Sequence, residues 1–207
     1  MKEITLKRTN TLQLYKDTLA NSMSYPEYRA LVADHVIRGT SSGPEQTEAL
    51  SQYTLLNDSR MRRLDKTTKV SEEIIQAFKD FKGNQTWLVL TESWCGDAAQ
   101  TMPVMNVLAN LSENIDFKVA LRDENLEVMN QFLTNGSLSI PKLIVLNNKT
   151  NKLIATWGPR PSVASKMVAE YKTIHGVLTP EFKQELQVWY NKDKGQNTIQ
   201  DLKQLIS

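Results

Sequence analysis

Residues 86–103 read TWLVLTESWCGDAAQTMP, and this stretch decides the fold. The short apolar run from Trp87 to Leu90 predicts a strand that is buried on both faces. From Asp97 to Leu111, apolar residues recur at the spacing of a buried helical stripe. The only cysteine of the chain, Cys95, is therefore expected where a strand ends and a helix begins.

This position has consequences for the chemistry of Cys95. The first N–H groups of a helix lack partners within the helix and present partial positive charge, which favours a thiolate over a thiol. The carboxylate of Asp97, two residues later, acts in the opposite direction. Asp97 could tune the sulfur, move a proton, or only favour the start of the helix, and the sequence leaves these alternatives open.

Three spaced features resemble the thioredoxin superfamily: Trp94-Cys95-Gly96, a proline eight residues after the cysteine, and Ile140-Pro141 before an apolar strand. The resemblance extends over roughly residues 70–175 and includes a glycine, Gly158, after the last strand. It implies an α/β thioredoxin-like fold with a cis bond before Pro141, a catalytic Cys95 beside this proline, and N–H groups of the Gly96–Ala98 turn that hold the sulfur. It also implies a substrate surface made of Trp94, Gly96, Asp97, Ala98, Ile140 and Pro141.

The chain departs from the family pattern at two positions. Ala98 stands where thioredoxins carry the second cysteine, and Val89 stands where family members tend to carry a buried acid. Because the chain has one cysteine, an intramolecular dithiol–disulfide cycle is excluded.

Two main hypotheses follow for function. In the first, Cys95 exchanges with the disulfide of a protein or of a small thiol, or is oxidised to a sulfenic acid, and an external thiol resolves the product. In the second, the chain is a redox-inactive binding module of the same fold, whose N-terminal helices recognise a partner. A third possibility is that Cys95 links two chains. For Cys95 the simpler interpretation is a small buried hydrophobe, and for Trp94 it is a core aromatic residue.

The remaining sequence predicts a mixed central sheet with helices on both faces, a helical N-terminal extension (1–69), a thioredoxin-like core (70–176) and C-terminal helices (177–207). The expected strands cover residues 87–90, 115–121, 142–146 and 152–157. The expected helices cover residues 10–38 (divided near Ser24), 45–66, 71–82, 97–111, 123–133, 159–175, 179–190 and 199–206. Arg122 and Asp123 follow a strand and either reach the Cys95 end of the sheet or form an ordinary ion pair.

Composition narrows the class of protein. The net charge of +2 gives no argument for nucleic acid or an anionic membrane as a partner. No secretory leader and no run of ~18 apolar residues is apparent, and one cysteine fits a reducing compartment, so a cytoplasmic protein is expected. His35 and His175 lack companions at ligand spacing, so no metal or other cofactor is predicted. The basic residues from Arg60 to Lys69 are interpreted as a solvated helix face, and the oligomeric state is left open.

Overall fold

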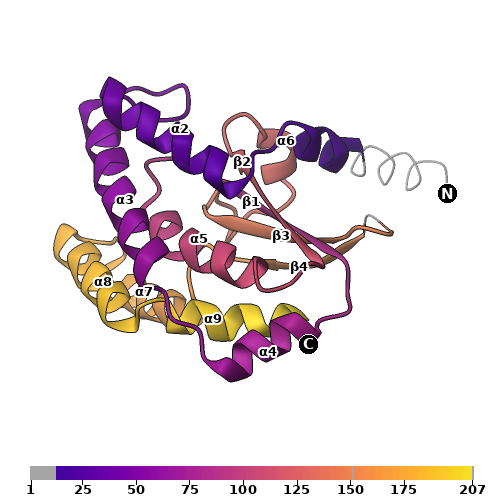
Figure 1. Cartoon of the computed structure of the whole chain (residues 1–207). Helices are drawn as coiled ribbons and strands as arrows, with labels where there is room; N and C mark the ends of the chain where they lie inside the picture. The colour runs from indigo at the N-terminus through magenta and orange to yellow at the C-terminus, as the bar shows by residue number, and fades with distance from the viewer. Residues whose placement is uncertain (1–12, 151, 207) are drawn as a thin grey trace.

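The computed structural model describes residues 13–150 and 152–206, and its centre is a four-stranded mixed sheet (Figure 1). The strands are β1 (Gln85–Thr91), β2 (Ile115–Leu121), β3 (Lys142–Asn147) and β4 (Leu153–Trp157). They lie in the order β2-β1-β3-β4. β1 is parallel to β2 and antiparallel to β3, and β3 is antiparallel to β4. With the helices on both sides, this is the α/β thioredoxin-like fold that the sequence predicts.

Helices occupy most of the remaining described chain. Residues 13–20 are helical. The labelled helices are α2 (Tyr25–Arg38), α3 (Glu48–Thr67), α4 (Glu72–Asp80), α5 (Gly96–Ala109), α6 (Leu126–Met129), α7 (Ser162–His175), α8 (Pro180–Asp193), α9 (Gln196–Lys203) and the 3₁₀ turn η1 (Gln204–Ile206). Within these residues, no helix combines the length and the apolar character needed to cross a bilayer.

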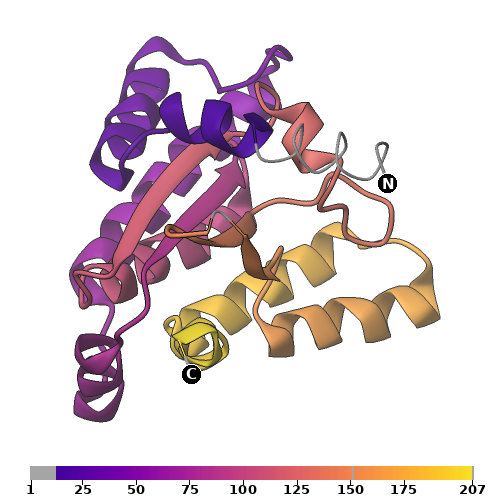
Figure 2. The same cartoon turned by 90° about the vertical axis from the view of Figure 1, so that its right-hand side faces the viewer.

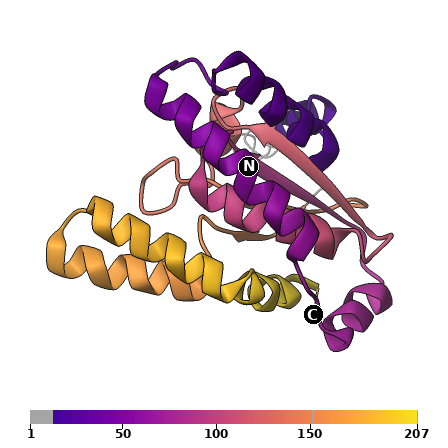
Figure 3. The ribbon, with the colours of Figure 1, turned by 60° about the vertical axis from the view of Figure 1, so that its left-hand side comes forward.

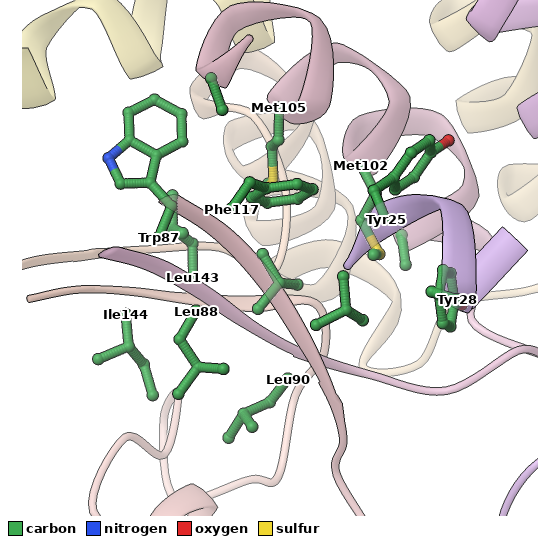
Figure 4. Packing of buried hydrophobic residues seen from close by; sticks show 14 of the residues in the cluster. Tyr25, Tyr28, Trp87, Leu88, Leu90, Met102, Met105, Phe117, Leu143 and Ile144 are labelled. Carbon is green, nitrogen blue, oxygen red and sulfur yellow. The ribbon is translucent and has the colours of Figure 1, made fainter. Parts of the chain in front are cut away.

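The core surrounds β1, whose seven residues are all buried. Alternate side chains of a strand point to opposite faces. Figure 4 accordingly shows Trp87 and Met105 on one side of the strands, and Leu88 and Ile144 on the other. Val89, which stands where thioredoxins tend to carry a buried acid, has no exposed surface, and packing in the core is sufficient to explain an apolar residue there. The strand ends at Thr91, and its carboxyl end leads directly to the Cys95 turn.

The N-terminal helices share this core. Tyr25 and Tyr28 of α2 and Met61 of α3 are buried in the same hydrophobic cluster as the sheet. The segment before α2 also covers the free edge of β2, because Met23 and Val119 exchange two backbone hydrogen bonds of 2.7 and 2.8 Å. Pairing of this kind removes an open strand edge, which would otherwise invite aggregation.

The helices α7 and α8 form an antiparallel hairpin that projects from the sheet (Figures 2 and 3). Its buried residues form a second hydrophobic cluster, separate from the main one: Ala164, Val168, Phe182, Leu186 and Tyr190. Tyr171 stacks on Phe182 with 4.0 Å between ring centroids. The hairpin therefore brings its own small core and lies beside α5.

Two predicted helices are shorter than expected. The helix predicted over residues 123–133 is reduced to α6. Residues 123–125 lie outside it, and at its other end the amides of Gln131 and Phe132 bond to carbonyl groups three residues earlier instead of four. The helix predicted to reach Lys82-Gly83 ends at Asp80, since Phe81 is extended and folds its ring over Gly83.

Candidate functional site

Cys95 is the N-cap residue of α5, at the carboxyl end of β1. It is 7% exposed. Its thiol donates a hydrogen bond to the carbonyl oxygen of Ile140 at 3.3 Å and accepts one from the backbone N–H of Ala98 at 3.5 Å. The sequence therefore places the sulfur correctly at the strand–helix junction, and the structure surrounds it with protein.

The pKa of the Cys95 thiol is raised to about 12. Burial is the main cause, and the negative charge of Asp97 adds to it. The N–H groups of Ala98 and Asp97 and the cation of Arg160 act in the opposite direction but do not compensate. The favourable effect of the helix N-terminus is thus present and is outweighed, so the resting group is a thiol at neutral pH.

Asp97 is held by two partners from the C-terminal part of the chain. Its Oδ2 lies 2.7 Å from Nη2 of Arg160, and its Oδ1 accepts a hydrogen bond of 2.9 Å from the hydroxyl of Tyr190. Burial raises the pKa of Asp97, whereas Arg160 and Tyr190 lower it. Asp97 therefore links the start of α5 to the loop before α7 and to α8. It does not act only as a favourable charge at the helix N-terminus.

Beside this cluster, a groove of about 550 Å³ opens at Cys95. One wall comes from α3, including Leu50, Tyr53 and Arg60. The opposite wall comes from the loop before α7 and from α8, including Arg160 and Lys183. Trp94 to Asp97 and Ile140 also line it, so five of the predicted site residues meet at one place.

Trp94 and Arg122 meet at one end of the groove. The guanidinium carbon of Arg122 lies 5.0 Å from the centroid of the Trp94 ring, and both residues line the groove. Arg122 also pairs with Asp123 at 2.7 Å. Arg122 thus both reaches the Cys95 end of the sheet and forms an ordinary ion pair. Trp94 lines the groove and also packs partly against the core.

Ile140 and Pro141 lie on the other side of the sulfur. The Ile140–Pro141 peptide bond is cis. Gly158 approaches this segment so closely that a Cβ would lie 2.2 Å from the carbonyl oxygen of Pro141, and its φ is +112°. Only glycine fits there. Pro141 and Ala98 are both buried and do not line the groove, so a partner in the groove would not touch them directly.

Sequence reasoning missed several residues of the site. Arg60 belongs to the basic segment interpreted as a solvated face, yet it lines the groove. A Cβ at Gly96 would lie 3.3 Å from Nη1 of Arg60, which places this cation beside the Cys95 turn. Arg160 and Tyr190 were missed because nothing in the local sequence links them to Asp97. Arg62, in contrast, forms the expected i,i+4 ion pair with Asp58.

A buried acid lies close to the site, although not at Val89. Glu92 has no exposed surface, accepts hydrogen bonds from the Ser42 hydroxyl and from the backbone N–H of Asp123 (2.9 Å), and its pKa is raised, mainly by burial. Its backbone carbonyl accepts a hydrogen bond from Tyr28 at 3.3 Å. Among residues 13–150 and 152–206, no three His, Cys, Asp or Glu side chains gather in a way that could hold a metal ion.

Comparisons with known proteins identify the family. The chain is similar to a protein of unknown function from Pseudomonas aeruginosa, with 15% identity, a TM-score of 0.62, and coverage of 93% of this chain and 96% of the other. It is also similar to an HIV epitope-scaffold, with 16% identity, a TM-score of 0.55, and coverage of 89% and 98%. At these identities the two structures show the fold alone. No curated protein matches the chain. The profile described as thioredoxin matches residues 43–172, which is more than half of the sequence, and the chain therefore belongs to the thioredoxin family.

Proposed function

We propose that this protein is a binding protein built on the thioredoxin fold, whose groove at Cys95 receives a partner while the sulfur stays a thiol. The observation that carries this proposal is the environment of Cys95: its thiol is buried and donates a hydrogen bond to the Ile140 carbonyl oxygen. The thiolate is the nucleophile in disulfide exchange, so a protonated, enclosed sulfur is a poor one. With a single cysteine, the chain also has no second thiol to complete a cycle.

The position of α3 supports the same proposal. Leu50, Tyr53 and Arg60 of α3 form one wall of the groove. α3 lies within residues 43–172, which the thioredoxin profile matches, and it takes part in the surface that surrounds Cys95. This is the arrangement expected when a helix beside the Cys95 turn contributes to the recognition of a partner. We place the protein in the cytoplasm, because a lone cysteine fits a reducing compartment.

A second candidate function is monothiol exchange, and one observation favours it: Cys95 lines the groove at the start of α5, beside the Ile140–Pro141 bond. In this reaction the Cys95 thiolate would attack a disulfide R–S–S–R′ and form a mixed disulfide with one sulfur. The S–S bond would break and R′–S⁻ would leave. An external thiolate R″–S⁻ would then attack the R sulfur of the mixed disulfide, so that R–S–S–R″ leaves and the Cys95 thiolate is regenerated.

The two functions are separated by intact mass after incubation with oxidised glutathione or dilute peroxide at pH 7.5. For the binding protein we expect no adduct on the folded chain, and complete adduct formation on the same chain unfolded in urea. The Cys95→Ser variant supplies the baseline in both conditions. A mixed disulfide or a sulfenic acid that forms rapidly on the folded chain would refute the binding-only role and support monothiol exchange.

A further inference from the structure

The groove at Cys95 is strongly cationic for its size. The charged side chains on its walls, among the residues that the structure describes, are four cations, Arg60, Arg122, Arg160 and Lys183, and one carboxylate, Asp97. The four cations come from four separate segments of the chain. Positive charges concentrated in a concave surface attract an anionic partner and select against a cationic one.

Two of these cations already have an acidic partner. Arg160 pairs with Asp97 at 2.7 Å, and Arg122 pairs with Asp123, just outside the groove, at 2.7 Å. The Nε of Arg160 is nevertheless buried without a hydrogen-bond partner among the residues that the structure describes. Arg160 thus keeps one N–H donor that is not used within the described part of the protein.

Arg60 is partly buried and lacks an acidic partner. Its Nη1 donates to the side-chain oxygen of Asn57 at 3.0 Å, and in the described chain no carboxylate lies within 4.0 Å of it. Burial, followed by the nearby charge of Arg63, lowers its pKa. The negative charge of Asp97 raises the pKa of Arg60 again, without forming an ion pair with it. A partly buried guanidinium with no carboxylate in contact is stabilised by an anion that reaches it. Lys183, on the opposite wall, is exposed and also forms no ion pair within the described residues.

Apolar surface continues from the groove along α3. Tyr53 lines the groove, is 50% exposed, and also borders a shallow hollow formed with Leu55 and Leu56, which are 46% and 45% exposed. Large apolar side chains left at the surface next to a groove are typical of an interaction site. A small anion would use the cations alone and leave this apolar surface uncovered.

We propose that the groove binds an extended acidic peptide segment of a protein partner, whose carboxylates meet Arg60 and Lys183 and whose apolar side chain lies on Tyr53. This inference rests on the proposed function, because it takes the groove as the place where a partner binds. The complementarity of charge determines the occupant, and the apolar surface on α3 favours a chain segment over an isolated ion.

The test is an array of random-sequence peptides of about twelve residues, probed with the full-length protein. We expect the retained peptides to be enriched in Asp and Glu around an apolar residue. The affinity of the best peptide, measured by fluorescence anisotropy, should fall as salt is raised. An array that retains no peptide above background, or one without acidic enrichment, would overturn the proposal.

Matched variants locate the interaction. Arg60→Gln should weaken binding of the best peptide about tenfold or more, as expected for a charge-assisted hydrogen bond. Lys183→Gln, at an exposed position where folding is not in question, should weaken it several-fold. The control is Arg38→Gln, which removes the same charge from a surface pair with Asp34. Equal losses in Arg38→Gln and Arg60→Gln would show non-specific attraction and would refute the assignment.

Failure of this inference is distinguishable from failure of the proposed function. If the folded chain forms a Cys95 adduct while acidic peptides still bind in the groove, the binding-only role is wrong and the acidic preference stands. If Cys95 is inert and acidic peptides do not bind, the binding role survives and the acidic preference is wrong.

Discussion

The thiol of Cys95 should react with iodoacetamide at least about a thousandfold more slowly in the folded protein than in the same protein unfolded in urea, at pH 7.5. The magnitude follows from the pKa of Cys95, which burial and the charge of Asp97 raise from 9.0 to about 12. At a pH below both pKa values, each unit by which the pKa is raised reduces the thiolate population about tenfold. The thiolate is the form that reacts with iodoacetamide. Restricted access to a side chain that is 7% exposed would slow the reaction further.

The assay is intact mass against time, over a pH series from 7 to 11. In the folded protein the rate should still rise tenfold per pH unit at pH 10, whereas in urea it should reach half its maximum near pH 9 and level off above about pH 10. Asp97→Asn should accelerate the folded-state reaction, because it removes a negative charge that raises the pKa of the thiol. The reasoning would be refuted by folded and unfolded rates within tenfold of each other, or by a folded-state plateau below pH 9.

Three further predictions concern stability, measured by urea unfolding. Arg160→Gln should lower the free energy of unfolding by about 3 kcal/mol, because it leaves Asp97 buried without its cation. Adding Asp97→Asn should restore part of this loss. A double variant that loses the sum of the two single losses would contradict the prediction. Burial holds the pKa of Glu92 above its ordinary value. As the pH rises past the ordinary pKa of a glutamate, the folded protein must therefore carry a buried negative charge, which lowers its stability. The wild type should therefore gain stability relative to Glu92→Gln when the pH falls from 7 toward 4.5. If the wild type loses stability relative to the variant over this range, the pKa of Glu92 is lowered rather than raised by folding. Phe78→Ala should cost about 3–5 kcal/mol, since Phe78 has no exposed surface and packs edge-on against Trp87 at 6.0 Å; a cost below 1 kcal/mol would show that the core collapses around it.

The local parts of the fold could be predicted from the sequence, because their signals are short-range. The strand at Trp87, the helix start at Cys95 and the turn after Asn147 each depend on neighbouring residues, and they lie where the pattern places them. The thioredoxin-like arrangement followed from Trp94-Cys95-Gly96 and Ile140-Pro141 together. The helix predicted over residues 123–133 was wrong at both ends, since only Leu126–Met129 is helical. After it, apolar residues recur but the amides of Gln131 and Phe132 bond three residues back.

The charge environment of the sulfur could not be predicted, because it depends on residues distant in sequence. Arg160 and Tyr190 reach Asp97 from 63 and 93 positions away. Periodicity indicates which face of α3 is apolar, but not that Arg60 lies beside Gly96. The sequence left open whether the helix N-terminus or the carboxylate of Asp97 dominates the pKa of Cys95. The largest cause is burial, which is a property of the assembled fold and could not be read from the local sequence.

The separate hydrophobic cluster of the α7–α8 hairpin has a consequence for amide hydrogen exchange. Its buried residues contact one another and not the main core, and the hairpin is joined to α5 by polar contacts such as Tyr190 to Asp97 and Gln187 to Gln100. Elements with their own small core open as separate cooperative units at a free energy below that of global unfolding. The amides of α7 and α8 should thus lose protection together and earlier than those of β1 and β3, so that the wall and the floor of the groove belong to different units of cooperativity.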